Sequence, residues 1–205
     1  MLKIWGRATS SNVQKVMWTI GELGLPHERI DAGGKFGGLD TPDYIAMNPN
    51  KLVPTLQDGD LTMWESAACV RYIAAQYGSG KLWSPDAKAR ARADKWMDWN
   101  TNILGADTWA VFGGLVRTAP SKQNPAAIAA GAKGLGEKYA IVDRELASKP
   151  FIAGDQLSIG DIVVGTGLYR YLTLPIARPL LSNLERYYAA LVARPAYKSH
   201  VMVSY

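Results

Sequence analysis

Apolar and polar residues alternate along the first part of the chain in a way that predicts a strand, a helix and a second strand. Short strands are expected at 2–5 and 27–31. The helix between them carries its apolar residues on one face, and these are Val13, Val16, Met17, Ile20 and Leu23. Gly24, followed by Pro26, indicates where this helix ends. A strand, a helix and a strand in this order form a parallel unit with a right-handed crossover.

A β-hairpin and a further helix are predicted next. The apolar runs 53–56 and 61–63 flank Asp58-Gly59, a dipeptide typical of two-residue hairpin turns. Glu65-Ser66 offers a cap directly before a stretch with helical spacing that ends near residue 77. With a short helix expected at 41–47, the elements follow the order of a thioredoxin-like domain.

Pro54 is the most informative residue of this hairpin. A proline has no amide hydrogen, so the strand that it opens belongs at an edge or beside a turn. If the Val53–Pro54 bond is cis, the amide and carbonyl of Val53 face outward and are able to pair with an extended peptide. An ordinary trans bond at Pro54 and plain helix capping by Glu65-Ser66 are the simpler alternatives.

The second part of the chain shows helical spacing and no convincing strand pattern. Helices are predicted at 86–116, 124–147, 159–173 and 182–193. Ser158 and Asp161 stand at the spacing of a capping box at the start of the third of these helices. We therefore expect an α/β domain at 1–80, a linker at 81–87 and an all-helical domain at 88–205.

The composition disfavours several classes of protein. The single cysteine excludes an internal disulfide and a Cys-x-x-Cys redox or zinc motif. No apolar run approaches the roughly 18 residues that span a bilayer, and a signal-peptide pattern is lacking, so we expect a cytoplasmic protein without membrane contact. The net charge of +5 does not indicate nucleic-acid binding, because the basic run 88–95 alternates with alanine and spreads its charge around a helix.

The succession of Val-Pro, strand, Asp-Gly turn, strand, Glu-Ser and helix resembles the glutathione-binding half of the cytosolic glutathione transferases. The segment from Gly154 to Asp161, with the sequence Gly-Asp-Gln-Leu-Ser-Ile-Gly-Asp, is similar to a buried N-capping motif of that family's helical domain. The resemblance covers nearly the whole chain. It implies a thioredoxin-like domain followed by an all-α domain, glutathione as co-substrate without a metal, a role in detoxification, and a two-fold homodimer.

The resemblance also implies which residues bind glutathione. Val53, before a cis Pro54, would pair with the peptide backbone, and Glu65 and Ser66 would hold the γ-glutamyl end. Many relatives have a basic residue directly before this valine, where the present chain has Leu52. Lys51 is then the candidate for the glycine carboxylate, and weak affinity is one consequence of the change.

Polar residues between the first strand and the first helix are the candidates for stabilising the glutathione thiolate. A transferase of this kind needs a donor aimed at the sulfur, because an unperturbed thiol has a pKa of about 8.5. The resemblance to serine-type relatives indicates Ser10 as the principal donor, and the nu-type bacterial relatives indicate Asn12 as the second. Ser11 forms part of the site or, with Gln14, a capping box. Thr9 is a reserve candidate, and the absence of tyrosine in this loop disfavours a tyrosine-type mechanism.

Asn100, Trp109 and Phe112 are the candidates for a pocket that holds a hydrophobic electrophile, although tryptophans at helical spacing are typical of a core. The predicted function is transfer of glutathione to such electrophiles. Reduction of disulfides by glutathione is an alternative, since the same thiolate attacks sulfur without an enzyme cysteine. A module that binds glutathione or hydrophobic ligands without turnover is a second alternative, favoured by Leu52.

Overall fold

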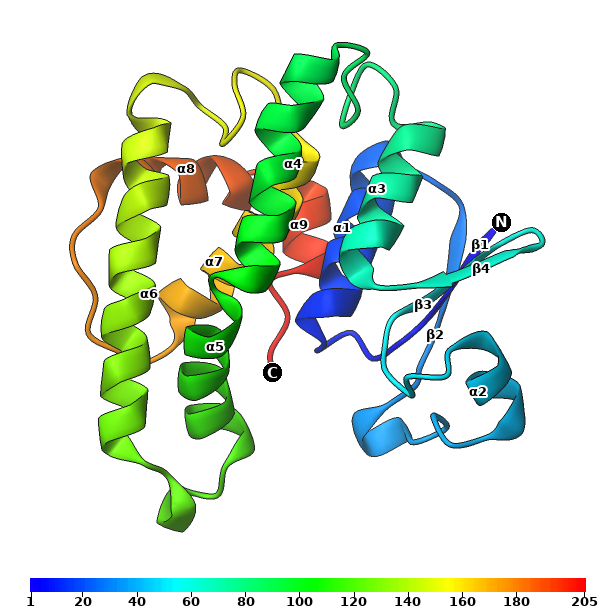
Figure 1. Ribbon diagram of the computed structural model, residues 1–205, viewed down its shortest axis with the longest axis horizontal. Coiled ribbons are helices and arrows are strands. Elements are labelled where there is room, and N and C mark those ends of the chain that lie inside the picture. The colour runs from blue at the N-terminus through cyan, green and yellow to red at the C-terminus, as the bar shows by residue number, and fades with distance from the viewer. The chain divides into compact units, whose positions relative to one another are not determined.

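The computed structural model describes residues 1–205 and separates the chain into two compact units. One unit comprises Met1–Trp83 and Arg194–Ser204, and the other comprises Ser84–Ala193 and Tyr205. We call them the α/β unit and the helical unit, because every strand lies in the first (Figure 1). The predicted fold class, a thioredoxin-like domain followed by an all-helical domain, is confirmed.

The α/β unit is built on a four-stranded sheet with the order β2-β1-β3-β4. Its strands are β1 (Leu2–Trp5), β2 (His27–Ile30), β3 (Thr55–Asp58) and β4 (Leu61–Trp64). As predicted, β1 and β2 are parallel, whereas β3 is antiparallel to both of its neighbours. Leu2 and Ile4 alternate with less buried residues along β1, as expected of a strand with one face in the core.

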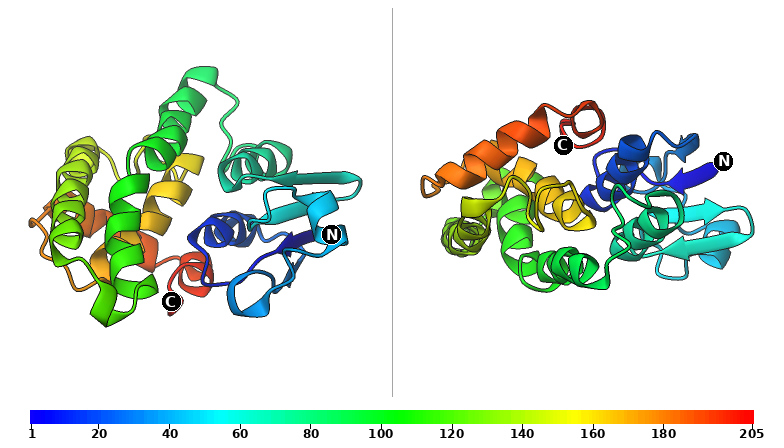
Figure 2. Two further views of the ribbon diagram at one scale, coloured as in Figure 1. Left: turned by 60° about the horizontal axis from the view of Figure 1, so that its bottom comes forward. Right: turned by 90° about the horizontal axis from the view of Figure 1, so that it is seen from above.

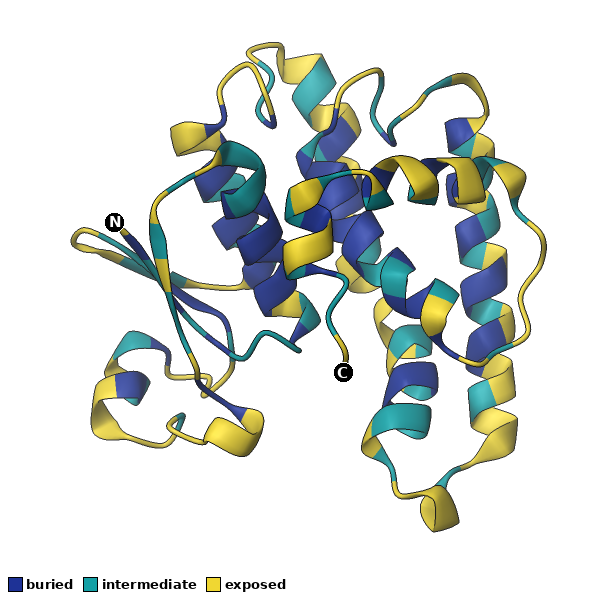
Figure 3. Cartoon of the chain, turned by 180° about the vertical axis from the view of Figure 1, so that it is seen from behind, coloured by how far each residue is buried: buried dark blue, intermediate teal, exposed yellow.

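Helices α1 (Ser11–Leu23) and α3 (Ser66–Tyr77) lie side by side and supply the other half of this core (Figure 1). Figure 3 shows α1 as buried along most of its length. Gly24 ends α1 in the left-handed conformation, at φ 65°, as the sequence predicts. A short 3₁₀ turn, η1 (Gly34–Phe36), and helix α2 (Pro42–Met47) connect β2 to the hairpin.

Strands β3 and β4 form the hairpin drawn in cyan in Figure 2. Its turn comes one residue later than predicted. Asp58 pairs with Leu61, so the two turn residues are Gly59 and Asp60 rather than Asp58 and Gly59. The left-handed Gly59, at φ 60°, takes the first turn position, where glycine is favoured. Val53 and Pro54 lie before the first strand of the hairpin and not within it.

A last helix, α9 (Pro195–His200), packs against α1 within the α/β unit and was not predicted. The rings of Trp18 and Tyr197 meet edge to face with 4.7 Å between their centroids. Arg194 binds both carboxylate oxygens of Glu22, with Nε at 2.8 Å and Nη2 at 2.5 Å. At six residues, α9 is too short to be stable without such contacts.

The helical unit contains α4 to α8 and several shorter turns. The elements are α4 (Ala87–Asn102), α5 (Gly105–Thr108), the π-helical η2 (Trp109–Arg117), η3 (Pro120–Lys122), α6 (Pro125–Glu145), η4 (Leu146–Ser148), α7 (Ile159–Thr173) and α8 (Ser182–Val192). The prediction of one helix at 86–116 was wrong. Helix α4 ends at Asn102, in a stretch from Asn100 to Gly105 whose polar residues and glycine are poor helix formers.

Asp161 stabilises the start of α7, as predicted. It is fully buried and forms a capping box with Ser158. Its carboxylate accepts hydrogen bonds from the amides of Ile152 and Ser158, both at 2.8 Å, and from the hydroxyls of Ser158 at 2.7 Å and Tyr187 at 2.9 Å. Asp161 thereby ties the preceding loop and α8 to the start of α7. None of the helices has both the length and the apolar character needed to cross a bilayer.

Candidate active site

A pocket in the α/β unit gathers most of the predicted glutathione-binding residues. Its walls come from the start of α1, the loop before β3 and the junction between β4 and α3. The lining residues are Asn12, Asn48, Asn50, Leu52, Val53, Pro54, Trp64, Glu65 and Ser66. Asn48, Asn50 and Trp64 were not predicted, although Asn48 and Asn50 flank a proline in the Asn-Pro-Asn stretch of the sequence, a typical turn signal. Ser10, Ser11 and Lys51 lie outside this lining.

The junction between β4 and α3 presents a carboxylate beside a helix N-terminus. Glu65 is the N-cap residue and has φ 69°, an unusual value for a residue with a side chain. Its side chain makes no capping hydrogen bond, so plain helix capping by Glu65 is contradicted. The first amides of α3 and the Ser66 hydroxyl suit a carboxylate, and the Glu65 side chain suits an ammonium group.

The main chain at Val53 is available for an extended ligand. The Val53–Pro54 peptide bond is cis, as the resemblance implied. Neither the amide nor the carbonyl of Val53 makes a backbone hydrogen bond. Pro54 is buried and Val53 is half-buried. A peptide laid along this edge therefore finds one free donor and one free acceptor.

Hydrogen bonds fix the loop that precedes Val53. Buried Asn48 donates from Nδ2 to the carbonyl of Leu52 at 2.9 Å and to Oγ1 of Thr55 at 3.2 Å. The Tyr44 hydroxyl donates to the same Leu52 carbonyl at 2.6 Å and accepts from Thr55 at 2.9 Å. Asn50 donates from both its main-chain amide and Nδ2 to Oδ1 of Asn48, each at 3.1 Å. Because Oδ1 of Asn48 accepts two of these bonds and the Nδ2 groups of both asparagines donate, both amides have a defined orientation.

The catalytic candidates at the start of α1 have different surroundings. Asn12 is exposed in the pocket, and Nζ of Lys15 donates to its Oδ1 at 3.1 Å. The lysine occupies the acceptor, so the Nδ2 hydrogens of Asn12 remain as donors for a ligand. Ser10 is the N-cap residue of α1, is 9% exposed and makes no side-chain capping bond.

The capping-box interpretation of Ser11 and Gln14 is contradicted. Ser11 is the first helical residue rather than the cap, and Nε2 of Gln14 donates to the carbonyl of Ala8 at 3.0 Å. Gln14 therefore holds the loop before α1 in place.

Lys51 and Leu52 both face solvent. Nζ of Lys51 lies 3.0 Å from Oδ1 of Asp40 in an ion pair, and half of the lysine side chain is exposed. Leu52 is 62% exposed, which is high for a leucine, and it contributes an apolar wall to the pocket. The loop thus presents a leucine to the pocket and pairs its lysine with an acid.

The three candidates for the electrophile pocket lie in the helical unit. Trp109 is 67% exposed, and its indole packs on the backbone of Gly113, where an added Cβ would lie 3.0 Å from the ring. Phe112 is buried under the Arg170 guanidinium, which lies 4.0 Å from the centre of its ring. Asn100 is half-buried in α4. Phe112 therefore belongs to the core of this unit, whereas Trp109 presents an aromatic face to solvent.

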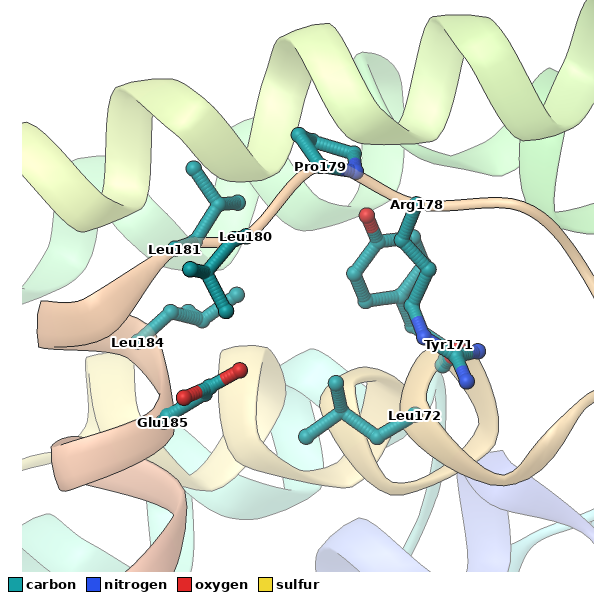
Figure 4. Close-up of a pocket in the computed structure, with 8 residues that line it drawn as sticks. All are labelled: Tyr171, Leu172, Arg178, Pro179, Leu180, Leu181, Leu184 and Glu185. Atoms are coloured by element: carbon teal, nitrogen blue, oxygen red, sulfur yellow. The ribbon is translucent and has the colours of Figure 1, made fainter.

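Two other features do not form part of this site. A cavity of about 180 Å³ lies in the helical unit between α7, α8 and the segment that joins them, and it contains none of the predicted residues (Figure 4). Cys69 is fully buried in α3, and burial, followed by the nearby Glu65 charge, raises the pKa of its thiol to about 12. This thiol is part of the core and is not a nucleophile.

The fold and the pocket together define a thioredoxin-fold protein whose pocket lies between a cis-proline loop and a helix N-terminus. Within this class the chain belongs to the glutathione S-transferase family. Models of the family's N-terminal and C-terminal domains match residues 9–76 and 125–190.

Individual relatives resemble the chain over its whole length. Glutathione S-transferase GstB of Escherichia coli is 43% identical, covering 99% of both chains. Glutathione S-transferase 3 of Zea mays is 29% identical over 98% of this chain and 93% of its own. The crystal structure of a theta class glutathione S-transferase from Xanthomonas axonopodis pv. citri with glutathione bound has a TM-score of 0.95 and 45% identity, covering 99% of this chain and 98% of that one.

Proposed function

We propose that this member of the glutathione S-transferase family binds glutathione in the pocket of the α/β unit and transfers its thiolate to hydrophobic electrophiles. The observation that carries the proposal is the meeting of Asn12, Val53, Glu65 and Ser66 in one pocket. These residues come from three separate segments. Together they supply a hydrogen-bond donor for the thiolate, a main-chain edge that can pair with a peptide, and a site for the ammonium and carboxylate of an amino acid.

Glutathione would lie extended along the edge at Val53. The amide and carbonyl of Val53 pair with the main chain of its cysteine, as in strand addition. The α-carboxylate of the γ-glutamyl residue meets Ser66 and the first amides of α3, and its α-ammonium meets Glu65. This orientation directs the cysteine sulfur toward the start of α1.

Asn12 is the group that we place on the sulfur. Its Nδ2 donates a hydrogen bond to the thiolate, which lowers the pKa of the thiol because the charged form is the better acceptor. Support comes from the exposure of Asn12 in the pocket and from the Lys15 bond that orients its amide. Ser10, outside the pocket lining, remains the alternative donor. The exposed indole of Trp109 offers an apolar surface for an aromatic electrophile.

Thiolate attack on a mixed disulfide is a second candidate reaction. Cys69 is buried and unreactive, so such an attack would use glutathione alone. A two-fold homodimer is the expected assembly, and light scattering at twice the monomer mass would support it.

The test is a Ser66→Ala substitution with Ser182→Ala as its matched control. Both serines are the first residue of a helix, and Ser182 is an exposed residue of α8 that does not line the pocket. Calorimetry with glutathione should show a loss of about tenfold in affinity for Ser66→Ala, roughly 1.4 kcal/mol, and no change for Ser182→Ala. Turnover of an aromatic halide and of a mixed disulfide is measured on the same samples. Wild-type protein that binds no glutathione at millimolar concentration, or that turns over neither substrate, contradicts the proposal.

A further inference from the structure

The pocket contains almost no positive charge. Glu65 is its single ionisable lining residue, and no lysine, arginine or histidine is present in the lining. Glutathione at neutral pH carries two carboxylates and one ammonium group. The ammonium group would pair with Glu65, and the γ-glutamyl carboxylate would lie at the positive N-terminus of α3. No lining residue is then left to neutralise the glycine carboxylate.

The glycine end of the ligand is expected to lie at Asn50 and Leu52. With the γ-glutamyl end at Glu65 and Ser66, and the cysteine paired with Val53, the rest of an extended peptide runs along the preceding loop. Asn50 and Leu52 are the lining residues of that loop with exposed side chains. An amide and an apolar side chain therefore replace the cation that a carboxylate needs.

Lys51 does not provide the missing positive charge, although it is the nearest cation in the sequence. It lies outside the pocket lining, and its Nζ is 3.0 Å from the Asp40 carboxylate. An anion drawn to Lys51 would also approach Asp40, and the repulsion between the two anions offsets the attraction to the lysine. A neutral group at this position meets no such opposition.

The orientation of Asn50 adds a preference for a hydrogen-bond donor. Its Nδ2 donates to Oδ1 of Asn48, and Asn48 is fixed by its own donation to the Leu52 carbonyl. A rotated Asn50 amide would set two carbonyl oxygens against each other, so the network fixes the amide orientation and leaves Oδ1 of Asn50 as an acceptor for a ligand, beside the second hydrogen of Nδ2. A carbonyl oxygen repels a carboxylate and accepts from an amide N–H.

We propose that the preferred thiol substrates are γ-glutamylcysteinyl peptides whose C-terminal end is uncharged, in particular amides. The inference rests on the proposed function and refines it. The amide N–H of such a substrate donates to Asn50, while Leu52 covers any apolar substituent on the nitrogen. Glutathione itself binds, but less tightly.

Calorimetry with three ligands tests the proposal. The ligands are glutathione, glutathione amide and the glycine ethyl ester of glutathione, which lacks both the charge and the terminal N–H. Wild-type protein should bind the amide about three- to tenfold more tightly than glutathione, with the ester between them. Equal or tighter binding of glutathione overturns the inference. If none of the three binds at millimolar concentration, both the inference and the proposed function fail.

Variants test whether the missing positive charge causes the preference and whether the glycine end lies at Leu52. Leu52→Lys, at an exposed position, supplies the missing cation. It should increase the affinity for glutathione about tenfold and leave the affinity for glutathione amide unchanged. Asp40→Asn releases Lys51 and should shift the preference in the same direction. Glu65→Gln is the control, because it changes the residue proposed to bind the γ-glutamyl end, which all three ligands share. It should lower the affinity for all three by the same factor. A Leu52→Lys variant that strengthens the amide as much as glutathione contradicts the proposed position of the glycine end.

Discussion

At the scale of single residues, Asn12 and Ser10 are the two candidates that we propose for the hydrogen-bond donor to the glutathione sulfur. Asn12 lines the pocket with its carbonyl held by Lys15, whereas Ser10 is nearly buried at the N-cap of α1. A hydroxyl and an amide are comparable donors, so exposure in the pocket is the difference that matters. The geometry favours Asn12, although the sequence resemblance had ranked Ser10 first.

Asn12→Ala should therefore lower kcat/KM for an aromatic halide by about tenfold, equivalent to about 1.4 kcal/mol of transition-state stabilisation. Ser10→Ala, the matched control, should change it by less than about threefold, roughly 0.65 kcal/mol. Loss of the donor raises the pKa of the bound thiol, so the Asn12→Ala deficit should shrink as the pH approaches the pKa of free glutathione. If Ser10→Ala lowers kcat/KM more than Asn12→Ala does, Ser10 is the donor to the glutathione sulfur and the assignment to Asn12 is wrong.

At the scale of elements, the start of α7 depends on one buried carboxylate. Asp161 accepts four hydrogen bonds, and removing it leaves two amides and two hydroxyls without their acceptor. Each buried donor without a partner costs about 1–3 kcal/mol. Asp161 thus connects the preceding loop, α7 and α8 through one side chain.

We expect Asp161→Ala to lower the free energy of unfolding by about 3 kcal/mol or more. Asp155→Ala, at an exposed position of the same segment, should change it by less than about 0.5 kcal/mol. Urea denaturation followed by circular dichroism measures both. Similar midpoints for the two variants would show that the hydrogen bonds of Asp161 contribute no net stability.

At the scale of the whole molecule, the chain returns to its first unit through α9, and we expect the contact between α9 and α1 to be sensitive to pH. His200 lies against Gly21 of α1, and the centres of its ring and the His27 ring are 6.2 Å apart. Burial lowers the pKa of His200, and the charges of His27 and Arg29 lower it further. The folded protein then binds a proton less readily than the unfolded chain, so stability is complete above the ordinary histidine pKa and falls as the pH drops below about 6.5.

His200→Gln should reduce this loss of stability between about pH 7.5 and pH 5. The urea midpoint of the wild type is expected to decrease over that range, and the midpoint of the variant should decrease less. Equal slopes for the two proteins would mean that His200 titrates alike in the folded and unfolded chains.

Several parts of the candidate site followed from the sequence, because they depend on neighbouring residues. Val53-Pro54 and Glu65-Ser66 each combine a backbone constraint with a polar group within two positions. Asn50 could not be predicted in this way. The role that we propose for it depends on an amide orientation that Asn48 fixes, and on the pairing of Lys51 with Asp40, eleven positions earlier.

The sequence by itself determined the fold class, the strand and helix order and most element boundaries, because apolar periodicity and capping residues act over a few positions. Tertiary structure alone decided where the hairpin turns, where the helix after residue 86 breaks and that α9 packs on α1. It also decided which polar atoms face the pocket. These features arise from contacts between distant segments, and a single linear pattern does not specify the partners of such contacts.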